Sequence, residues 1–94
     1  MIVFVGYYSP ENYELLLKTA NDRKKLDDKW EDWLMNFIKV KTSLSGEFSV
    51  QEFHVDVEKM NQYFRANKIK NTSANRAKYI QKVGGSELQK RTNN

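Results

Sequence analysis

Several residue types that carry common protein chemistries are absent or scarce in this chain. Cysteine is absent, and the 94 residues contain one histidine, four glycines and one proline. Without cysteine there is no disulfide, thiol nucleophile, iron–sulfur cluster or zinc ribbon, and one histidine excludes metal sites built from several imidazoles. The chain also lacks the glycine-rich phosphate-binding motifs and the G-x-S-x-G motif of serine hydrolases. The sequence therefore predicts a protein that is not an enzyme, with no metal and no cofactor.

Long hydrophobic segments are missing as well. No apolar run approaches the roughly 18 residues of a membrane helix, and residues 1–9 have neither the basic start nor the long apolar stretch of a secretory signal. We therefore expect a cytoplasmic protein with no membrane partner. Aromatic residues make up 13% of the chain. Because each aromatic ring buries a large apolar area, we expect one small domain around a thin, aromatic-rich core.

Two short β-rich segments stand among helical ones. Residues 2–7 begin with a continuous run of β-branched and aromatic residues, which is typical of a strand buried on both faces. A second strand is predicted near residues 51–55. The apolar residues of segment 48–57 change from one parity to the other near Gln51 and Glu52, which indicates either a bulge there or a shorter strand over residues 52–55. Four amphipathic helices are predicted, over residues 10–20, 28–45, 57–66 and 73–83. The expected start signals, in chain order, are Ser9-Pro10, an Asp28/Glu31 capping box, Asp56, and Thr72 or Ser73. The expected end signals are a left-handed Gly46 for the second helix, Asn67 for the third and Gly84-Gly85 for the fourth.

This order of elements, β-α-α-β-α-α, predicts a helix-dominated α+β fold with a two-stranded sheet. The connection between the strands is long enough for parallel pairing. Residues 1–83 form the predicted domain, and residues 84–94 a disordered basic tail. The expected core comprises Val3, Val5, Leu16, Trp30, Leu34, Phe37, Ile38, Phe53, Val55, Met60, Phe64, Ile69 and Ile80.

Charge is distributed unevenly along the chain. Residues 1–64 carry eight basic and eleven acidic side chains, whereas residues 65–94 carry eight basic side chains and Glu87 alone. An acidic body with a basic C-terminal third suggests a polyanionic partner. The alternative is that the basic segment only keeps its helix soluble.

Two other groups of polar residues receive a structural interpretation. His54 lies on the opposite face of its strand from Phe53 and Val55, so we expect a surface residue rather than a ligand or a base. A cluster of carboxylates alternates with basic residues, so we interpret it as a mutually neutralised helix start rather than a metal site. Its members are Asp22, Asp27, Asp28, Glu31 and Asp32.

Residues 57–83 form a helix–connector–helix unit whose connector is longer than the three or four residues of a helix-turn-helix. The unit resembles the SAP-type helix–extended-loop–helix module. The residues that carry the resemblance are Val57, Met60, Phe64, Ile69, Arg76, Tyr79, Ile80 and Val83. It implies DNA binding through the second helix and the loop, with Arg76 and Lys82 at basic positions and Ile69 as the buried loop residue. The chain departs from the family where Lys68 and Ser73 stand near the usual glycines, and the alignment needs a one-residue insertion.

Two hypotheses for function follow. In the first, the protein binds DNA or RNA weakly through the basic unit, with Lys and Arg side chains on phosphates and short polar side chains beside them. In the second, it is a protein–protein interaction module or small accessory subunit, which pairs with a second copy or with another protein. The candidate nucleic-acid-binding residues are Arg65, Lys68, Lys70, Asn71, Ser73, Asn75, Arg76, Lys78 and Lys82.

Overall fold

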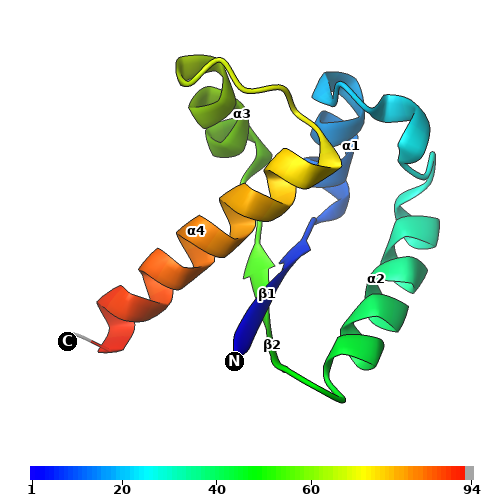
Figure 1. The fold of residues 1–94 in the computed structure, drawn as a ribbon. Helices are drawn as coiled ribbons and strands as arrows, with labels where there is room; N and C mark the ends of the chain where they lie inside the picture. Colours follow the sequence, from blue (N-terminus) through cyan, green and yellow to red (C-terminus); the bar gives the residue numbers. More distant parts are fainter. Residues whose placement is uncertain (93–94) are drawn as a thin grey trace.

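The computed structural model describes residues 1–92, which form a two-stranded parallel sheet with helices on both sides (Figure 1). Strand β1 (Ile2–Tyr7) pairs with β2 (Ser49–His54) in a register that places Phe4 beside Gln51. The second strand begins two residues earlier than predicted, and its register runs without a bulge. The predicted α+β class, order of elements and two-stranded sheet are confirmed.

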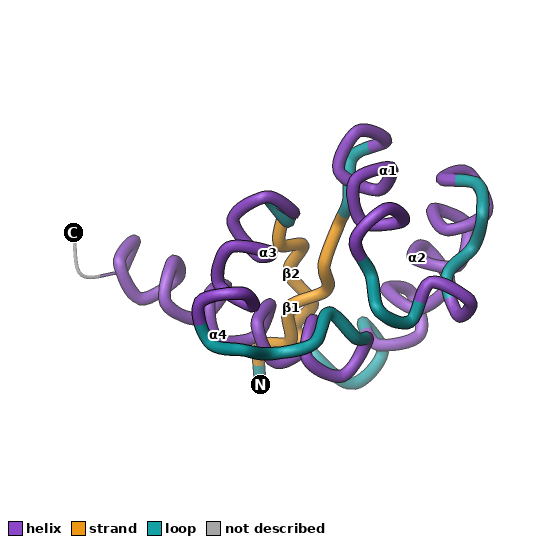
Figure 2. The backbone as a smooth tube through the Cα atoms, turned by 90° about the horizontal axis from the view of Figure 1, so that it is seen from above, coloured by secondary structure: helices purple, strands orange, loops and turns teal. Residues whose placement is uncertain are grey.

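Four α-helices surround the strands, and the two helices between the strands carry the chain back for parallel pairing. Figure 2 shows α4 and α2 on opposite sides of the strands. The elements outside the sheet are α1 (Pro10–Thr19), a 3₁₀ helix (Arg23–Lys25), α2 (Trp30–Leu44), α3 (Val57–Ala66) and α4 (Ser73–Thr92).

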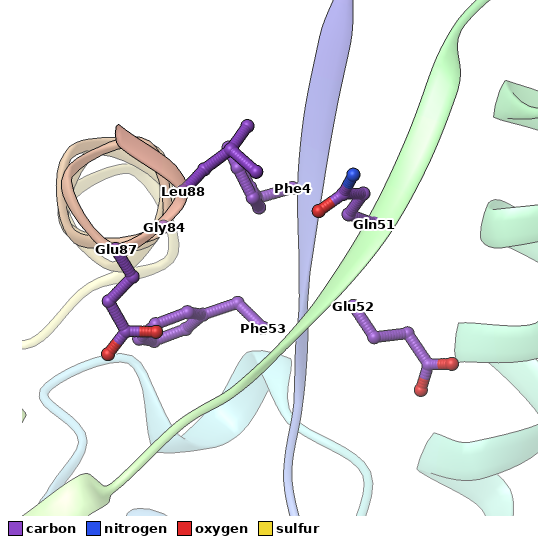
Figure 3. Close-up of a pocket in the computed structure, with 7 residues that line it drawn as sticks. All are labelled: Phe4, Gln51, Glu52, Phe53, Gly84, Glu87 and Leu88. Carbon is purple, nitrogen blue, oxygen red and sulfur yellow. The ribbon is translucent and has the colours of Figure 1, made fainter. Parts of the chain in front are cut away.

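The two faces of the sheet contact different helices, because successive side chains of a strand point to opposite faces. Phe4 points towards α4, where its ring lies against Gly84 (Figure 3). Tyr7 points the other way, and its ring centroid lies 5.8 Å from Trp33 and 5.7 Å from Phe37 of α2. The sheet is therefore the middle layer between α4 and α2.

The core lies where α1, α3 and α4 meet the carboxyl ends of the strands. Six of the predicted core residues are buried, namely Leu16, Phe53, Val55, Met60, Phe64 and Ile80. Six more are half-buried, namely Val3, Val5, Trp30, Leu34, Phe37 and Ile69. Tyr13 is buried although it was not among the expected core residues, and its hydroxyl donates a hydrogen bond of 2.6 Å to the Asp27 carbonyl, so its polar end is satisfied. The prediction for Ile38 is wrong, because its side chain on α2 is 53% exposed.

Two of the predicted side-chain N-caps, Ser9 and Asp56, are confirmed, since each accepts a hydrogen bond from a backbone N–H in the first turn of its helix. The predicted capping box is wrong. Helix α2 begins at Trp30 with no side-chain cap, because the Asp28 carboxylate instead pairs with Arg23 at 2.6 Å.

The predicted end of the last helix is also wrong, since α4 continues through Gly84 and Gly85 to Thr92. Gly84 is buried, and a Cβ atom there would lie 2.7 Å from the ring of Phe4. This glycine thus allows the helix to approach β1 closely. Residues 84–92 of the predicted disordered tail belong to α4, and residues 93–94 lie outside the described residues.

The remaining end signals differ in detail. None of the four glycines has a positive φ, so Gly46 is not the predicted left-handed residue. After α3 the left-handed residue is Lys68, with φ 55°, rather than Asn67. The Ile69 N–H donates to the Phe64 carbonyl at 2.8 Å and the Lys68 N–H to the Arg65 carbonyl at 3.3 Å. This is the hydrogen-bond pattern of a Schellman motif, which directs the connector back along α3.

Candidate nucleic-acid interface

Helices α3 and α4 enclose a small groove with cations on its rim, called the α3–α4 groove below. Its volume is about 130 Å³, too small to enclose a ligand the size of a cofactor. Its lining residues are Tyr63, Phe64, Ile69, Asn75, Lys78, Tyr79 and Lys82.

The position of the groove follows from helical periodicity. Asn75, Lys78, Tyr79 and Lys82 are spaced at i, i+3, i+4 and i+7, so α4 presents all four side chains on one face. Tyr63 reaches the same place from α3. Two of the four predicted site lysines, Lys78 and Lys82, are therefore brought together.

Tyrosine rings form the floor of the groove. The ring centroids of Tyr63 and Tyr79 lie 5.3 Å apart at 42°, and Phe64 lies 5.9 Å from Tyr79. The Lys82 ammonium is 5.3 Å from the centroid of the Tyr63 ring, within the range of a cation–π interaction. Burial raises the pKa of the Tyr79 hydroxyl, and the acidic side chains of Asp56 and Glu87 raise it further. The floor is thus aromatic and neutral, and the charge lies on the rim.

The cations around the groove are not neutralised by neighbours in the sequence. Residues 59–86 contain no Asp or Glu, although they include seven Lys and Arg residues. One of these seven, Arg76, is in an ion pair within residues 1–92, and the other pairs there lie elsewhere, at Lys18–Glu14, Arg23–Asp28 and Lys41–Glu52. Lys78 and Lys82 therefore have no ion-pair partner within residues 1–92.

The structure corrects two of the predicted site residues. Arg76 and Asn71 are each only 5% exposed. Both terminal nitrogens of the Arg76 guanidinium donate to the Asp22 carboxylate, at 2.9 and 3.0 Å, and Nη1 also donates to Asn71 Oδ1 at 2.8 Å. These side chains hold the fold together and are out of reach of a phosphate.

This buried ion pair connects the two halves of the chain. The Asp22 carboxylate follows α1 and also accepts a hydrogen bond of 2.8 Å from the Ser73 N–H, at the start of α4. The Asn71 side chain donates to Asn61 of α3 at 2.9 Å. Because each polar group has a partner, the network fixes the connector and the first turn of α4 against α1 and α3.

The same network shifts two pKa values. Burial alone would raise the pKa of the Asp22 carboxyl, but the hydrogen bonds from Arg76 and Ser73 and the charge of Arg76 together lower it. Burial raises the pKa of the neighbouring Tyr8 hydroxyl to about 12, against the opposing charge of Arg76. Asp22 is therefore ionised and Tyr8 neutral at pH 7.

The other predicted site residues are exposed, apart from the half-buried Asn75, and they do not all lie in one place. Arg65 does not line the groove but a neighbouring hollow with Asn61, and Ile69 borders both. Lys68 and Lys70 are exposed on the connector, and Ser73 is exposed at the start of α4. The Asn75 side chain lines the α3–α4 groove and donates to the Lys70 carbonyl at 3.0 Å.

Sequence reasoning did not include Tyr63 and Tyr79 among the site residues. The sequence signal for them is a segment without Asp or Glu in which aromatic residues lie one helical turn from lysines. Tyr79, for example, lies three residues before Lys82.

The other candidate features are on the opposite face or are too small for a ligand. His54 is exposed, as predicted, and its ring centroid lies 4.9 Å from that of Tyr7. Figure 3 shows the hollow where Phe4 and Phe53 of the strands face Glu87 of α4, and its volume is about 40 Å³. Within residues 1–92 no three His, Asp or Glu side chains are placed to hold a metal ion.

None of the helices within residues 1–92 combines the length and the apolar character that a membrane crossing requires. Comparisons with protein-family models, with curated proteins and with solved structures give no match to this chain.

Proposed function

We propose that this protein binds nucleic acid weakly and without strong sequence preference, through the α3–α4 groove. The observation that carries the proposal is that Lys78 and Lys82, which are in no ion pair within residues 1–92, line a groove together with the rings of Tyr63 and Tyr79. A positively charged groove with aromatic rings is typical of surfaces that bind single-stranded nucleic acid, because the cations follow the phosphates and the rings contact bases.

The expected lack of sequence preference has a physical reason. Specific readout needs side chains that reach base edges. Two residues suited to it are buried in the fold: Arg76 is paired with Asp22, and the Asn71 side chain is bonded to Asn61 and Arg76. The exposed residues that remain are mainly lysines, which attract phosphates of any sequence. The resemblance of residues 57–83 to the SAP-type module stays a prediction, and the proposal does not depend on it.

The experiment is a fluorescence-anisotropy titration with a labelled, mixed-sequence single-stranded oligonucleotide at about 0.1 M salt. The test variant is Lys78→Glu/Lys82→Glu. Its matched control is Lys24→Glu/Lys39→Glu, which makes the same change in net charge at two exposed lysines that are in no ion pair within residues 1–92. We expect the test variant to lose at least about tenfold in affinity, or about 1.4 kcal/mol, and the control to lose much less.

The salt dependence gives a second readout. Each lost phosphate contact on a single strand should reduce the magnitude of the log–log salt slope by about 0.7, so the test variant should lose about 1.4. Equal losses of affinity in the two variants would mean that net charge alone drives binding. That result, or no binding by the wild type, would overturn the proposal. Circular dichroism of each variant checks that the fold is intact.

A further inference from the structure

The two outer edges of the sheet are treated differently by the rest of the molecule. The outer edge of β1 is closed by Gln81 of α4, whose side-chain amide accepts a hydrogen bond from the Phe4 N–H at 3.1 Å and donates to the Phe4 carbonyl at 2.6 Å. The Gln81 amide thus makes the two hydrogen bonds to Phe4 that the backbone of a third strand would make. Such an edge cannot pair with another chain at this position.

The outer edge of β2 has no such cover. The Ser49 N–H donates to the Met1 carbonyl and the Val55 N–H to the Tyr7 carbonyl, so alternate residues of β2 from Ser49 onward face β1. In a parallel ladder the residues between them point their N–H and C=O groups away from the partner strand. These are Val50, Glu52 and His54, and their backbone groups have no hydrogen-bond partner within residues 1–92.

This open edge borders an apolar hollow between β2 and α2, with a volume of about 410 Å³. Ile38 is on its wall although it is 53% exposed, which explains why the core prediction failed there. The residues that line the hollow are Tyr7, Leu34, Phe37, Ile38, Lys41, Thr42, Ser45, Val50 and Glu52. An unpaired strand edge and an exposed apolar helix face therefore lie side by side.

The features by which proteins usually protect an exposed edge are also missing from β2. Its six residues include no proline and its register contains no bulge. The charge of Glu52 is neutralised by Lys41, whose Nζ lies 2.7 Å from the carboxylate. The edge is thus regular and close to neutral, which permits pairing with a strand of another chain.

We infer that the β2 edge pairs with the β2 edge of a second copy of this chain, in antiparallel orientation about a two-fold axis. Such an axis stands perpendicular to the sheet, so both α2 helices fall on the same face and the apolar hollow of each copy adjoins that of the other. The Lys41–Glu52 pairs of the two copies meet around the axis as equal numbers of opposite charges, so the surface is complementary to itself. The strands then form a four-stranded sheet, which is more stable than two strands alone.

The inference is independent of the proposed function, because α4 with Lys78 and Lys82 lies on the other side of the sheet from α2 (Figure 2). The basic surfaces therefore do not meet in the dimer. Both α3–α4 grooves then lie on the same face of the joined sheet, opposite the face that carries the α2 helices.

The test is sedimentation equilibrium of the full chain between about 1 µM and about 1 mM, to obtain the dimer dissociation constant. Ile38→Glu places a charge in the hollow. Met35→Glu is its matched control, since Met35 is 60% exposed on the same helix but does not line the hollow. We expect Ile38→Glu to weaken the dimer at least about tenfold and Met35→Glu to leave it within about threefold of the wild type.

A second variant tests the strand edge itself. Val50→Pro removes an N–H that points outward, so it breaks no hydrogen bond to β1 but blocks pairing at the edge. We expect this variant to be monomeric with an unchanged far-ultraviolet circular dichroism spectrum. A wild type that is monomeric at every concentration would overturn the inference, as would a dimer that neither Ile38→Glu nor Val50→Pro weakens. A monomer whose β2 edge binds an unrelated extended peptide would also overturn it, in favour of a different partner.

Discussion

Substitution of Arg76 distinguishes a structural role of this residue from a role in ligand binding. Its side chain is 6% exposed and that of its partner, Asp22, is 10% exposed. Replacing Arg76 with Met leaves a buried carboxylate without its cation. Removal of one member of such a pair typically costs about 3–5 kcal/mol, which is a large part of the 5–15 kcal/mol that stabilises a typical domain.

The assay is urea unfolding followed by tryptophan fluorescence. Arg76→Met should lower the free energy of unfolding by about 3–5 kcal/mol. Lys78→Met, a change of the same kind at an exposed site on the same helix, should stay within about 0.5 kcal/mol. The double variant Asp22→Asn/Arg76→Met should recover much of the loss, because no charge is then left unpaired.

A combination of unchanged stability and reduced affinity in Arg76→Met would refute this reasoning. If Arg76→Met unfolds within about 0.5 kcal/mol of the wild type but loses oligonucleotide affinity as strongly as Lys78→Glu/Lys82→Glu, Arg76 is a ligand contact. The buried network would then not be what positions α4. The opposite pattern, a loss of stability in Arg76→Met and a loss of affinity in the lysine variant, is the one expected.

Three further predictions concern stability. Burial raises the pKa of Tyr8 to about 12, so the free energy of unfolding should fall by about 2–3 kcal/mol between pH 10 and 12. Tyr8→Phe should reduce this fall, as measured by urea unfolding at a series of pH values. A Cβ on Gly6 would lie 2.5 Å from Ile80 Cδ1, so Gly6→Ala should lower stability by about 1–3 kcal/mol, and Ile80→Val, which removes that atom, should make the same change less harmful in thermal unfolding. Lys68 has φ 55°, so Lys68→Gly should raise the free energy of unfolding in urea by about 0.5–1 kcal/mol; a decrease would show that the Lys68 side chain itself stabilises the turn.

The fold was largely predictable from local signals. The β-branched run in residues 2–7, the caps at Ser9 and Asp56, and the apolar spacing of the helices each depend on neighbours in the sequence, and the structure confirms them. Gly84 shows the limit of such reasoning. Two adjacent glycines usually end a helix, but here Gly84 is required by contact with Phe4, a residue 80 positions away.

The candidate site was less predictable, because burial of polar residues depends on tertiary contacts. Arg76 and Lys78 are both basic residues near the start of α4, and only the position of Asp22 makes the first structural and leaves the second exposed. In the same way, Ile38 belongs to an apolar stripe typical of a core. Its exposure follows from the absence of a third strand beside β2 within residues 1–92.

The most direct test of the proposed interface is to map it residue by residue. The measurement is an NMR titration of the isotope-labelled protein with a single-stranded oligonucleotide, in which changes of backbone amide shifts are followed. The proposal predicts that the amides of Tyr63, Lys78, Tyr79 and Lys82 shift together with one apparent affinity, and that raising the salt concentration reverses the shifts. Shifts centred on α2 and β2, or none at any site, would contradict nucleic-acid binding through the α3–α4 groove.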